Sequence, residues 1–383
     1  MKVLILSCKT GGGHDAAGLA MKERFELEGH EAIMFDYLTL AGSSVSKWVE
    51  KLYVSTVKYM PRVFGRVYKI GMFVSKRVKK SPVYYANAKM GKYLKEYLKE
   101  NSYDAIIMPH LYPAETITYM KSKNVPLPLT IGVATDYTCI PFWEETDCDY
   151  YVIPHKELVY EFSSRGIPRE KLVPIGIPVR QKFLEDLETD FKERLSKNAR
   201  EVLGLPTDKK IHLILSGSMG AGNIKELTSN VWNLNQQKIC VVVICGNNKK
   251  IFNRLKKQYK NVPNVFIVGH TKKMNLYMQA SDIVYTKPGG LTSTEVAVLG
   301  KPLVHTFPIP GCETANQEFF RKHRMSVSSK TTKGQALIGI KLLNSPGMVE
   351  RMKKAQIKNI KADAATDIME FIEDKLKEKN ILS

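Results

Sequence analysis

The chain has 383 residues, which suits two domains of ~190 residues better than one. Hydrophobic residues make up 44% of it and charged residues 25%, so a disordered or fibrous protein is excluded. The net charge of +20 favours an anionic partner, which is a membrane surface, a nucleic acid or a phosphorylated ligand.

The sequence shows no sign of a disulfide scaffold, a zinc site or a membrane span. The six cysteines form no C-x-x-C pair, and no histidine cluster has the spacing of zinc ligands. The thiols are therefore expected to be reduced, as in the cytosol. The apolar run at 3–6 is too short for a signal peptide, and no stretch approaches the ~20 apolar residues of a spanning helix. Any contact with a membrane is expected to be peripheral.

Short apolar runs alternate with helix-length segments along most of the chain, which predicts parallel sheets with crossover helices. The strands expected in the first half are 3–6, 31–36, 104–109, 129–135, 150–154 and 172–176. Those expected in the second half are 211–217, 239–246, 265–269, 282–286 and 302–306. Two such series predict an α/β protein with two Rossmann-like domains, 1–178 and 179–383. The polar, helical tail at 346–380 is a candidate to fold back and brace the first domain.

Residues 45–99 interrupt this alternation with helical patterns and a strong positive charge. Between Lys47 and Lys99 there are 14 basic and two acidic residues, a net charge of +12. Basic residues interleaved with aromatic ones favour an anionic membrane surface, and an ordinary solvated helix face is the alternative. The residues expected to meet the membrane are Trp48, Lys51, Arg62, Phe64, Arg66, Lys69, Phe73, Lys76, Arg77, Lys79 and Lys80.

A glycine-rich turn at 7–17 follows the first expected strand. Its glycines allow a ligand to approach the backbone closely, and the next helix presents its N-terminus there. His14 in this turn suits proton transfer near neutral pH. Two alternatives remain open: a capping or packed histidine, and a dinucleotide-binding turn built on Gly11 and Gly13 with Asp36 as the ribose ligand.

Two similar turns follow expected strands in the second half. The turn at 215–223 presents backbone N–H groups that suit a phosphate. The turn at 287–302 opens a helix with Thr292, and its Glu295 suits hydrogen bonds from ribose hydroxyls. The alternative for Glu295 is a glutamate that is merely favoured by the helix dipole. The polar loop at 308–320 suits the recognition of sugar hydroxyls.

Five segments in this order resemble one known family. They are GGGH at 11–14, TDY and a following Trp at 135–143, VGHTKKM at 268–274, KPGGLTSTE at 287–295 and PGCETAN at 310–316. They are similar to the lipid-directed GT-B glycosyltransferases, namely the monogalactosyldiacylglycerol synthases and the processive diacylglycerol glucosyltransferases. The resemblance implies two Rossmann-like domains that face a cleft, with the acceptor bound by the first and the nucleotide sugar by the second.

The resemblance also implies roles for particular residues. His14 matches the family's proposed base, and the acceptor side would be formed by Gly12, Gly13, Asp136 and Trp143. The positions that match the family's UDP site are Gly217, Ser218, Gly220, His270, Lys287, Pro288, Gly289, Gly290, Thr292 and Glu295. Glu313 and Asn316 match residues near the donor sugar, and Cys312 stands where the family usually has glutamine, so the hexose is not predicted.

The sequence therefore predicts an inverting transferase that moves glucose or galactose from a UDP-sugar to 1,2-diacylglycerol. It is expected to lie on the cytoplasmic face of the cell membrane, bound to anionic lipids, with no cofactor, no metal and no nucleic acid. Asp147-Cys148-Asp149 is a D-x-D motif, which other glycosyltransferases use to hold a cation. Because it precedes an expected strand in the acceptor half, a structural role is expected for it here. The alternatives are an N-acetylglucosamine transferase acting on a lipid-linked peptidoglycan precursor, a nucleic-acid-binding protein and a nicotinamide-dependent dehydrogenase.

Overall fold

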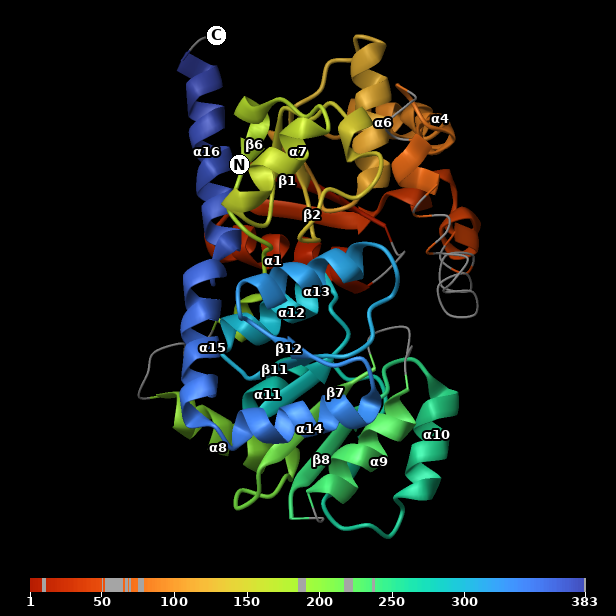
Figure 1. Ribbon diagram of the computed structural model, residues 1–383. Coiled ribbons are helices and arrows are strands. Elements are labelled where there is room, and N and C mark those ends of the chain that lie inside the picture. The colour runs from red at the N-terminus through yellow and green to blue at the C-terminus, as the bar shows by residue number, and fades with distance from the viewer. Residues whose placement is uncertain are drawn as a thin grey trace. The chain divides into compact units, whose positions relative to one another are not determined.

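The computed structural model describes residues 1–8, 12–49, 51, 65, 68, 70–74, 79–184, 191–216, 223–235 and 238–381. The chain forms two compact units, each built on its own parallel sheet (Figure 1). The first unit comprises Met1–Gln181, Pro310–Cys312 and Lys361–Ser383, and the second comprises Lys182–Ile309 and Glu313–Ile360. The first unit is therefore assembled from segments that lie on both sides of the second in the sequence.

The first unit has a six-stranded parallel sheet in the order β2-β1-β3-β4-β5-β6. Its strands are β1 (Lys2–Ser7), β2 (Glu31–Asp36), β3 (Ala105–Met108), β4 (Leu129–Val133), β5 (Tyr150–Val152) and β6 (Leu172–Val173). Since β2 pairs with one edge of β1 and β3 with the other, the winding of the chain reverses at β1. Sheets of this kind bind ligands outside the carboxyl ends of the strands at such a switch point.

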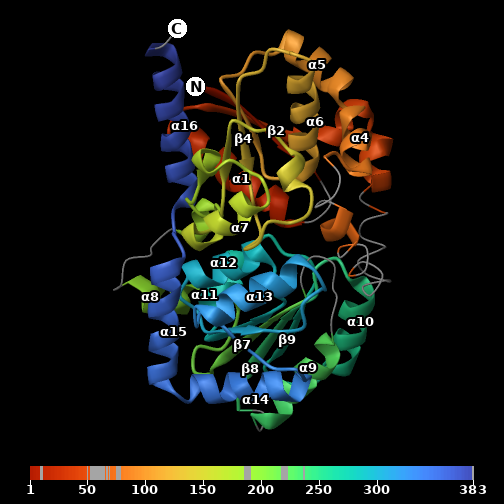
Figure 2. The ribbon, with the colours of Figure 1, turned by 45° about the horizontal axis from the view of Figure 1, so that its top comes forward.

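Helices cover both faces of this sheet. α1 (Gly12–Leu27) connects β1 to β2, and α6 (Leu111–Ser122) connects β3 to β4. Because the two crossovers run in opposite directions across the sheet and both are right-handed, the two helices lie on opposite faces. α4 (Pro82–Ala88) and α5 (Gly91–Glu100) pack beside α6 (Figure 2).

The C-terminal helix α16 (Ala364–Ile381) completes the core of the first unit. It packs along α1 (Figure 1). Its Ile368, Met369 and Ile372 are buried in the same hydrophobic cluster as Phe25 of α1 and residues of β1, β3 and β4. The apolar side of the first sheet is therefore closed by a helix that follows the whole second unit in the chain.

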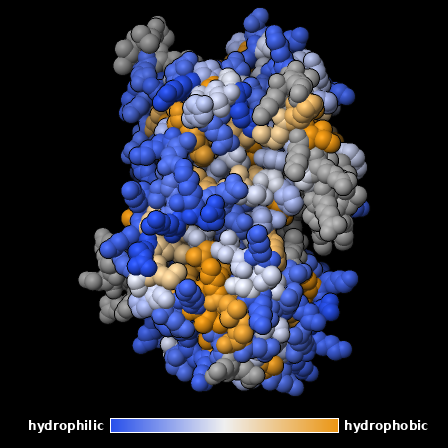
Figure 3. All heavy atoms as spheres, viewed as in Figure 1, coloured by the Kyte–Doolittle hydropathy of each residue, from blue (hydrophilic) through white to orange (hydrophobic). Residues whose placement is uncertain are grey.

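The second unit has a parallel sheet in the order β12-β11-β10-β7-β8-β9. The strands are β7 (Ile211–Leu215), β8 (Cys240–Ile244), β9 (Val265–Val268), β10 (Ile283–Thr286), β11 (Leu303–His305) and β12 (Val327–Ser328). The helices are α8 (Phe191–Leu203), α9 (Ile224–Leu234), α10 (Lys249–Gln258), α11 (Met274–Ala280), α12 (Gly290–Val298), α13 (Cys312–Lys322), α14 (Thr332–Leu343) and α15 (Pro346–Asn359). Hydrophobic residues gather on one face near α14, where Leu337 is 48% exposed (Figure 3). The switch point of this sheet lies at β7, between β8 and β10.

The strands expected from the sequence are confirmed, with small shifts at their ends, and so is their parallel arrangement in two sheets. β12 is the strand that the sequence does not predict, because two residues at a sheet edge are too few to show a hydrophobic pattern. Within the described residues, no helix is both long enough and apolar enough to cross a membrane.

The basic segment 45–99 is described only in part. Trp48 is 65% exposed and Phe73 is 56% exposed, which is unusual for side chains of this size. Lys51 and Lys79 are exposed as well. Six further residues of the expected membrane contact lie outside the described residues: Arg62, Phe64, Arg66, Lys69, Lys76 and Arg77.

Lys80 differs from the surface-facing cation that the sequence predicts. Its Nζ donates a hydrogen bond to the carbonyl oxygen of Glu145 and lies 4.4 Å from the centre of the Tyr84 ring. Burial lowers the pKa of its ammonium group, although nearby Glu145 acts in the opposite direction. Lys80 therefore ties this part of segment 45–99 to the backbone at Glu145, so its ammonium group is not a free surface charge.

Candidate active site

His14 lies at the switch point of the first sheet, in the first turn of α1. Its Nδ1 is 2.8 Å from the carbonyl oxygen of Pro109, which follows β3, and 3.0 Å from Oγ1 of Thr135, which follows β4. Three strand ends thus converge on one partly buried imidazole. The sequence singles out His14 but gives Pro109 no role, although its position at the end of an expected strand was a usable signal.

The partners of Nδ1 determine the tautomer of the neutral His14 ring. A carbonyl oxygen only accepts hydrogen bonds, so Nδ1 carries the proton that Pro109 accepts. The lone pair of the neutral ring is then on Nε2. None of the residues described in the structure hydrogen-bonds to this Nε2 atom. An imidazole held in this way can accept a proton from a bound hydroxyl.

The other residues expected on the acceptor side differ in their surroundings. Gly12 is exposed, and Gly13 and Asp136 are partly buried. Trp143 is only 3% exposed, and its ring packs edge-on against Tyr151 with the ring centres 6.0 Å apart. Trp143 is therefore part of the core below the acceptor side and does not line it.

Asp36 does not have the surroundings of a ribose ligand. Its Oδ1 accepts a hydrogen bond from the backbone N–H of Leu38, 3.1 Å away, and its Oδ2 accepts one from the hydroxyl of Ser46. Asp36 thereby caps the 3-10 helix η1 (Tyr37–Ala41). Because both carboxylate oxygens already have partners within the protein, the dinucleotide-binding alternative loses its acidic residue.

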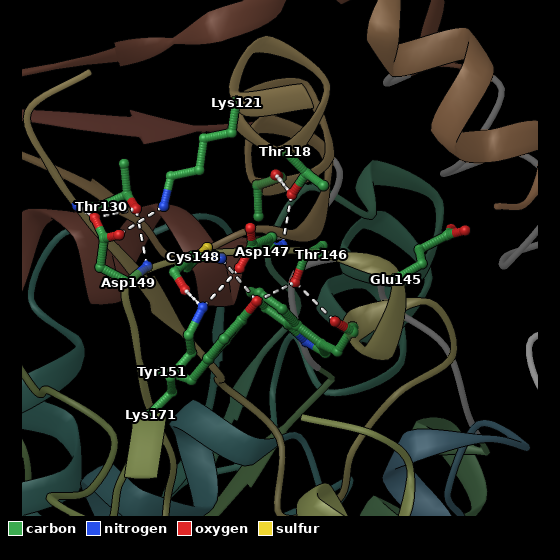
Figure 4. Close-up of polar contacts among 12 residues, drawn as sticks. Thr118, Lys121, Thr130, Glu145, Thr146, Asp147, Cys148, Asp149, Tyr151 and Lys171 are labelled. Atoms are coloured by element: carbon green, nitrogen blue, oxygen red, sulfur yellow. Dashed lines mark hydrogen bonds and ion pairs between the residues drawn. The ribbon is translucent and has the colours of Figure 1, made fainter. Parts of the chain in front are cut away.

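The D-x-D at 147–149 is held by lysines (Figure 4). Lys121 lies 2.7 Å from Asp149 and Lys171 lies 2.6 Å from Asp147. Burial alone would raise the pKa of Asp149, but hydrogen bonds from Lys121 and Thr130 outweigh it and the pKa is lowered. No group of three or more His, Cys, Asp or Glu side chains in the described part of the chain is arranged to hold a metal ion. The surroundings of both aspartates are those of a structural motif.

The turn after β10 is the corresponding feature of the second unit. Lys287 is followed by Pro288 and Gly289, and α12 begins at Gly290 with its N-terminus at the carboxyl end of the sheet. Nζ of Lys287 forms a 2.6 Å ion pair with Glu313, and Nδ2 of Asn316 donates to the carbonyl oxygen of Pro288 across 3.0 Å. The structure thus brings together residues that lie 26 and 28 positions apart in the chain.

Further residues of the expected donor site lie around the same helix. Thr292 is partly buried, Glu295 is 8% exposed and His270, after β9, is exposed. Ser293 lies 3.0 Å from Nε2 of His305, and burial lowers the pKa of this imidazole to about 3. Ser293 of α12 and His305 of β11 form a buried polar pair that the sequence does not reveal. The expected phosphate-side residues Gly217, Ser218 and Gly220 lie outside the described residues.

Each half of the chain matches a known protein family. Residues 14–179 match the family model of monogalactosyldiacylglycerol (MGDG) synthase, and residues 211–368 match that of the glycosyltransferase family 28 C-terminal domain. A processive diacylglycerol beta-glucosyltransferase of Staphylococcus saprophyticus is 28% identical over 359 residues, which cover 92% of this chain and 88% of the relative. The protein of the same name from Bacillus cereus is 28% identical over 371 residues, with 92% and 89% covered.

Solved structures share the fold at low sequence identity. MurG of Acinetobacter baumannii has a TM-score of 0.61 at 15% identity, with 97% of this chain and 99% of that chain covered. The UDP co-structure of MnaA from S. aureus has a TM-score of 0.65 at 14% identity, with 98% and 97% covered. The fold is therefore GT-B, with two Rossmann-like units. Since the two family models together span most of the sequence and full-length relatives bear one name, the chain belongs to the family of monogalactosyldiacylglycerol synthases and processive diacylglycerol glucosyltransferases.

Proposed function

We propose that this enzyme transfers a hexose from a UDP-sugar to the hydroxyl of 1,2-diacylglycerol, with inversion at the anomeric carbon, and so makes a membrane glycolipid. The observation that supports this most directly is the 2.8 Å contact between Nδ1 of His14 and the carbonyl oxygen of Pro109, from which the tautomer follows. Its Nδ1 is held by the Pro109 carbonyl, and its Nε2 is left to accept a proton. This imidazole lies in the half of the chain that matches the MGDG synthase model.

In the proposed reaction, His14 is the general base. The acceptor hydroxyl is a weak nucleophile, and Nε2 takes its proton as the oxygen attacks the anomeric carbon. The new C–O bond forms on the side opposite the leaving group while the bond from that carbon to the phosphate oxygen of UDP breaks. UDP leaves with the bonding electron pair. A single displacement of this kind inverts the anomeric centre.

The donor is proposed to bind at the second switch point. Backbone N–H groups at the start of α12, after Gly289, would stabilise the charge that grows on the diphosphate. Glu295 is proposed to accept hydrogen bonds from the ribose, and the backbone at His270 to meet the uracil. We further propose that Gly217, Ser218 and Gly220 contact the phosphates. Glu313 and Asn316 would serve the donor sugar by fixing Lys287 and Pro288.

The acceptor is proposed to reach the first unit from an anionic membrane surface on the cytoplasmic side. Support comes from the net charge of +12 between Lys47 and Lys99 and from the exposure of Trp48 and Phe73. Each lysine or arginine near anionic lipid contributes about 1 kcal/mol to binding. Exposed aromatic side chains add apolar contact at the headgroup level.

Product analysis tests the proposed reaction. Purified protein is incubated with labelled UDP-glucose, UDP-galactose or UDP-N-acetylglucosamine and with anionic vesicles that contain either diacylglycerol or a polyprenyl-linked acceptor. Hexosyl-diacylglycerol from one of the two UDP-hexoses is the expected product. No glycolipid from either UDP-hexose would contradict the proposal, and transfer of N-acetylglucosamine only to a polyprenyl-linked acceptor would favour the alternative substrate.

Vesicle sedimentation tests the membrane contact separately. The double variant Lys51→Gln, Lys79→Gln is expected to bind anionic vesicles more weakly than the wild type. The matched control is Lys249→Gln, Lys250→Gln, which removes the same charge from two exposed residues of α10 in the second unit. Equal loss in both variants would show that only net charge matters and would contradict a dedicated contact in segment 45–99.

A further inference from the structure

We infer that His110 is a positioning residue for His14: its ring fixes the plane of the His14 imidazole, while its own Nδ1 caps α6. The inference rests on the proposed role of His14 as the base. It assigns a function to a second, buried histidine that neither the motifs nor the reaction as described above uses.

His110 occupies the junction between β3 and α6. It is 7% exposed, and its backbone is extended, as is usual for a residue that caps a helix. Nδ1 of His110 accepts the backbone N–H of Tyr112 across 3.1 Å. This bond anchors the His110 ring to the first turn of α6, so the ring has little freedom to rotate.

The His14 ring packs edge-to-face against this anchored ring. The two ring centres are 4.5 Å apart and the planes meet at 75°. His110 also packs against Tyr112, with ring centres 4.6 Å apart and planes at 70°. His14 is thus held by two adjacent residues in two ways: the Pro109 carbonyl fixes the direction of Nδ1, and the His110 ring fixes the ring plane. Together these contacts determine where Nε2 points.

The charge state of His110 suits this role. Burial lowers the pKa of His110 far below its usual value, and the neighbouring His14 lowers it further. His110 therefore stays neutral when His14 takes up a proton, and the two rings do not repel each other. A basic residue that became charged at this place would oppose proton transfer to Nε2.

Two substitutions separate the ring contact from the helix cap. His110→Asn keeps a strong capping side chain and removes the ring, whereas His110→Phe keeps a ring and removes the cap. If His110 positions His14, His110→Asn is expected to lower kcat at least tenfold while Tm and the KM for the UDP-sugar stay near wild-type values. His110→Phe is expected to keep most of kcat and to lower Tm. His110→Ser, which also caps well, replaces the Asn variant if that does not fold.

Normal kcat in the Asn or Ser variant would overturn the inference, as would a loss of kcat that follows Tm in every variant. A measurement that needs no turnover separates this inference from the proposed function. The ¹⁵N chemical shifts of His14 are expected to show protonated Nδ1 in the wild type and a mixture of tautomers in His110→Asn. Unchanged shifts would refute the positioning role even if the wild type transferred no sugar, and a changed mixture would support it.

Discussion

Lys287 and Glu313 form a 2.6 Å ion pair in which the side chains are only 13% and 10% exposed. The second carboxylate oxygen of Glu313 accepts the backbone N–H of Ile309 across 2.8 Å. One carboxylate therefore fixes both the turn that precedes α12 and the loop that precedes α13. This contact therefore helps to set the geometry of the expected donor site.

Breaking this pair is expected to destabilise the second unit. Glu313→Gln leaves the Lys287 ammonium buried without its counter-charge, which costs about 3 kcal/mol. The double variant Lys287→Met, Glu313→Gln should recover much of this loss, because no unpaired charge remains. Urea unfolding of both variants measures the difference, and equal stability of the two would show that the pair is not the source.

Removal of the His14 imidazole is expected to slow catalysis strongly and to leave nucleotide binding intact. General base catalysis contributes about 10²- to 10⁴-fold to a rate, so kcat of His14→Ala should fall by that factor. Calorimetric titration with UDP serves as the control and should give a Kd close to that of the wild type. Turnover of His14→Ala near the wild-type rate would remove His14 from the role of base.

Two buried histidines make the stability of the second unit depend on pH. Burial lowers the pKa of His212 to about 4 and that of His305 to about 3. Both rings are neutral in the folded unit near pH 6, whereas the unfolded chain binds protons below its histidine pKa of about 6.5. The stabilisation is complete above that value and is lost as the pH falls toward the folded-state pKa values.

The loss should approach about 2.7 kcal/mol per pH unit between about pH 6 and about pH 5, where two protons are taken up on unfolding. His305→Gln should halve this slope, because only the proton taken up by His212 then contributes to it. Denaturant unfolding at several pH values measures it. A slope that does not change in His305→Gln would mean that the ring is charged in the folded state.

The contribution of α16 to the first unit can be measured with one substitution. Ile372 is fully buried, and Ile372→Ala is expected to lower the free energy of unfolding by about 2 to 5 kcal/mol. Ile357 on α15 is 63% exposed, so Ile357→Ala is a matched control that should change it by less than about 0.5 kcal/mol. Equal effects would show that α16 is not part of the core.

Most of the fold could be predicted from the sequence, because parallel strands buried on both faces appear as continuous apolar runs. The runs at β1 and β8 are examples. The sequence offers the tail at 346–380 as a brace for the first domain but does not divide it: α15 belongs to the second unit, and the brace is α16. Its apolar residues show which side is buried but not which unit buries it, since that depends on contacts across more than three hundred positions, such as Arg24 with Asp363.

The sequence predicts which residues belong to the candidate site better than it predicts which residues contact each other there. Glycine turns after strands led to His14 and to Lys287, since such turns have local patterns. The partners Pro109 and His110 come from another strand end and carry no motif of their own, and Thr135 belongs to the TDY segment, which does not show that its side chain meets His14. The resemblance implies an acceptor-side place for Trp143, and the charge of segment 45–99 predicts a membrane contact for Lys80. In the fold, Trp143 is buried and Lys80 is hydrogen-bonded to the backbone at Glu145.

The place of α16 in the chain has a consequence for synthesis on the ribosome. Residues 182–360 are available in full before Ile368, Met369 and Ile372 leave the exit tunnel. Until then, the hydrophobic surface of the first unit that α16 covers stays exposed. This differs from the usual case, in which domains fold in the order in which they are translated. In this chain the second unit can fold before the first. The exposed hydrophobic surface of the first unit must be covered by a chaperone or by lipid until α16 has been synthesised.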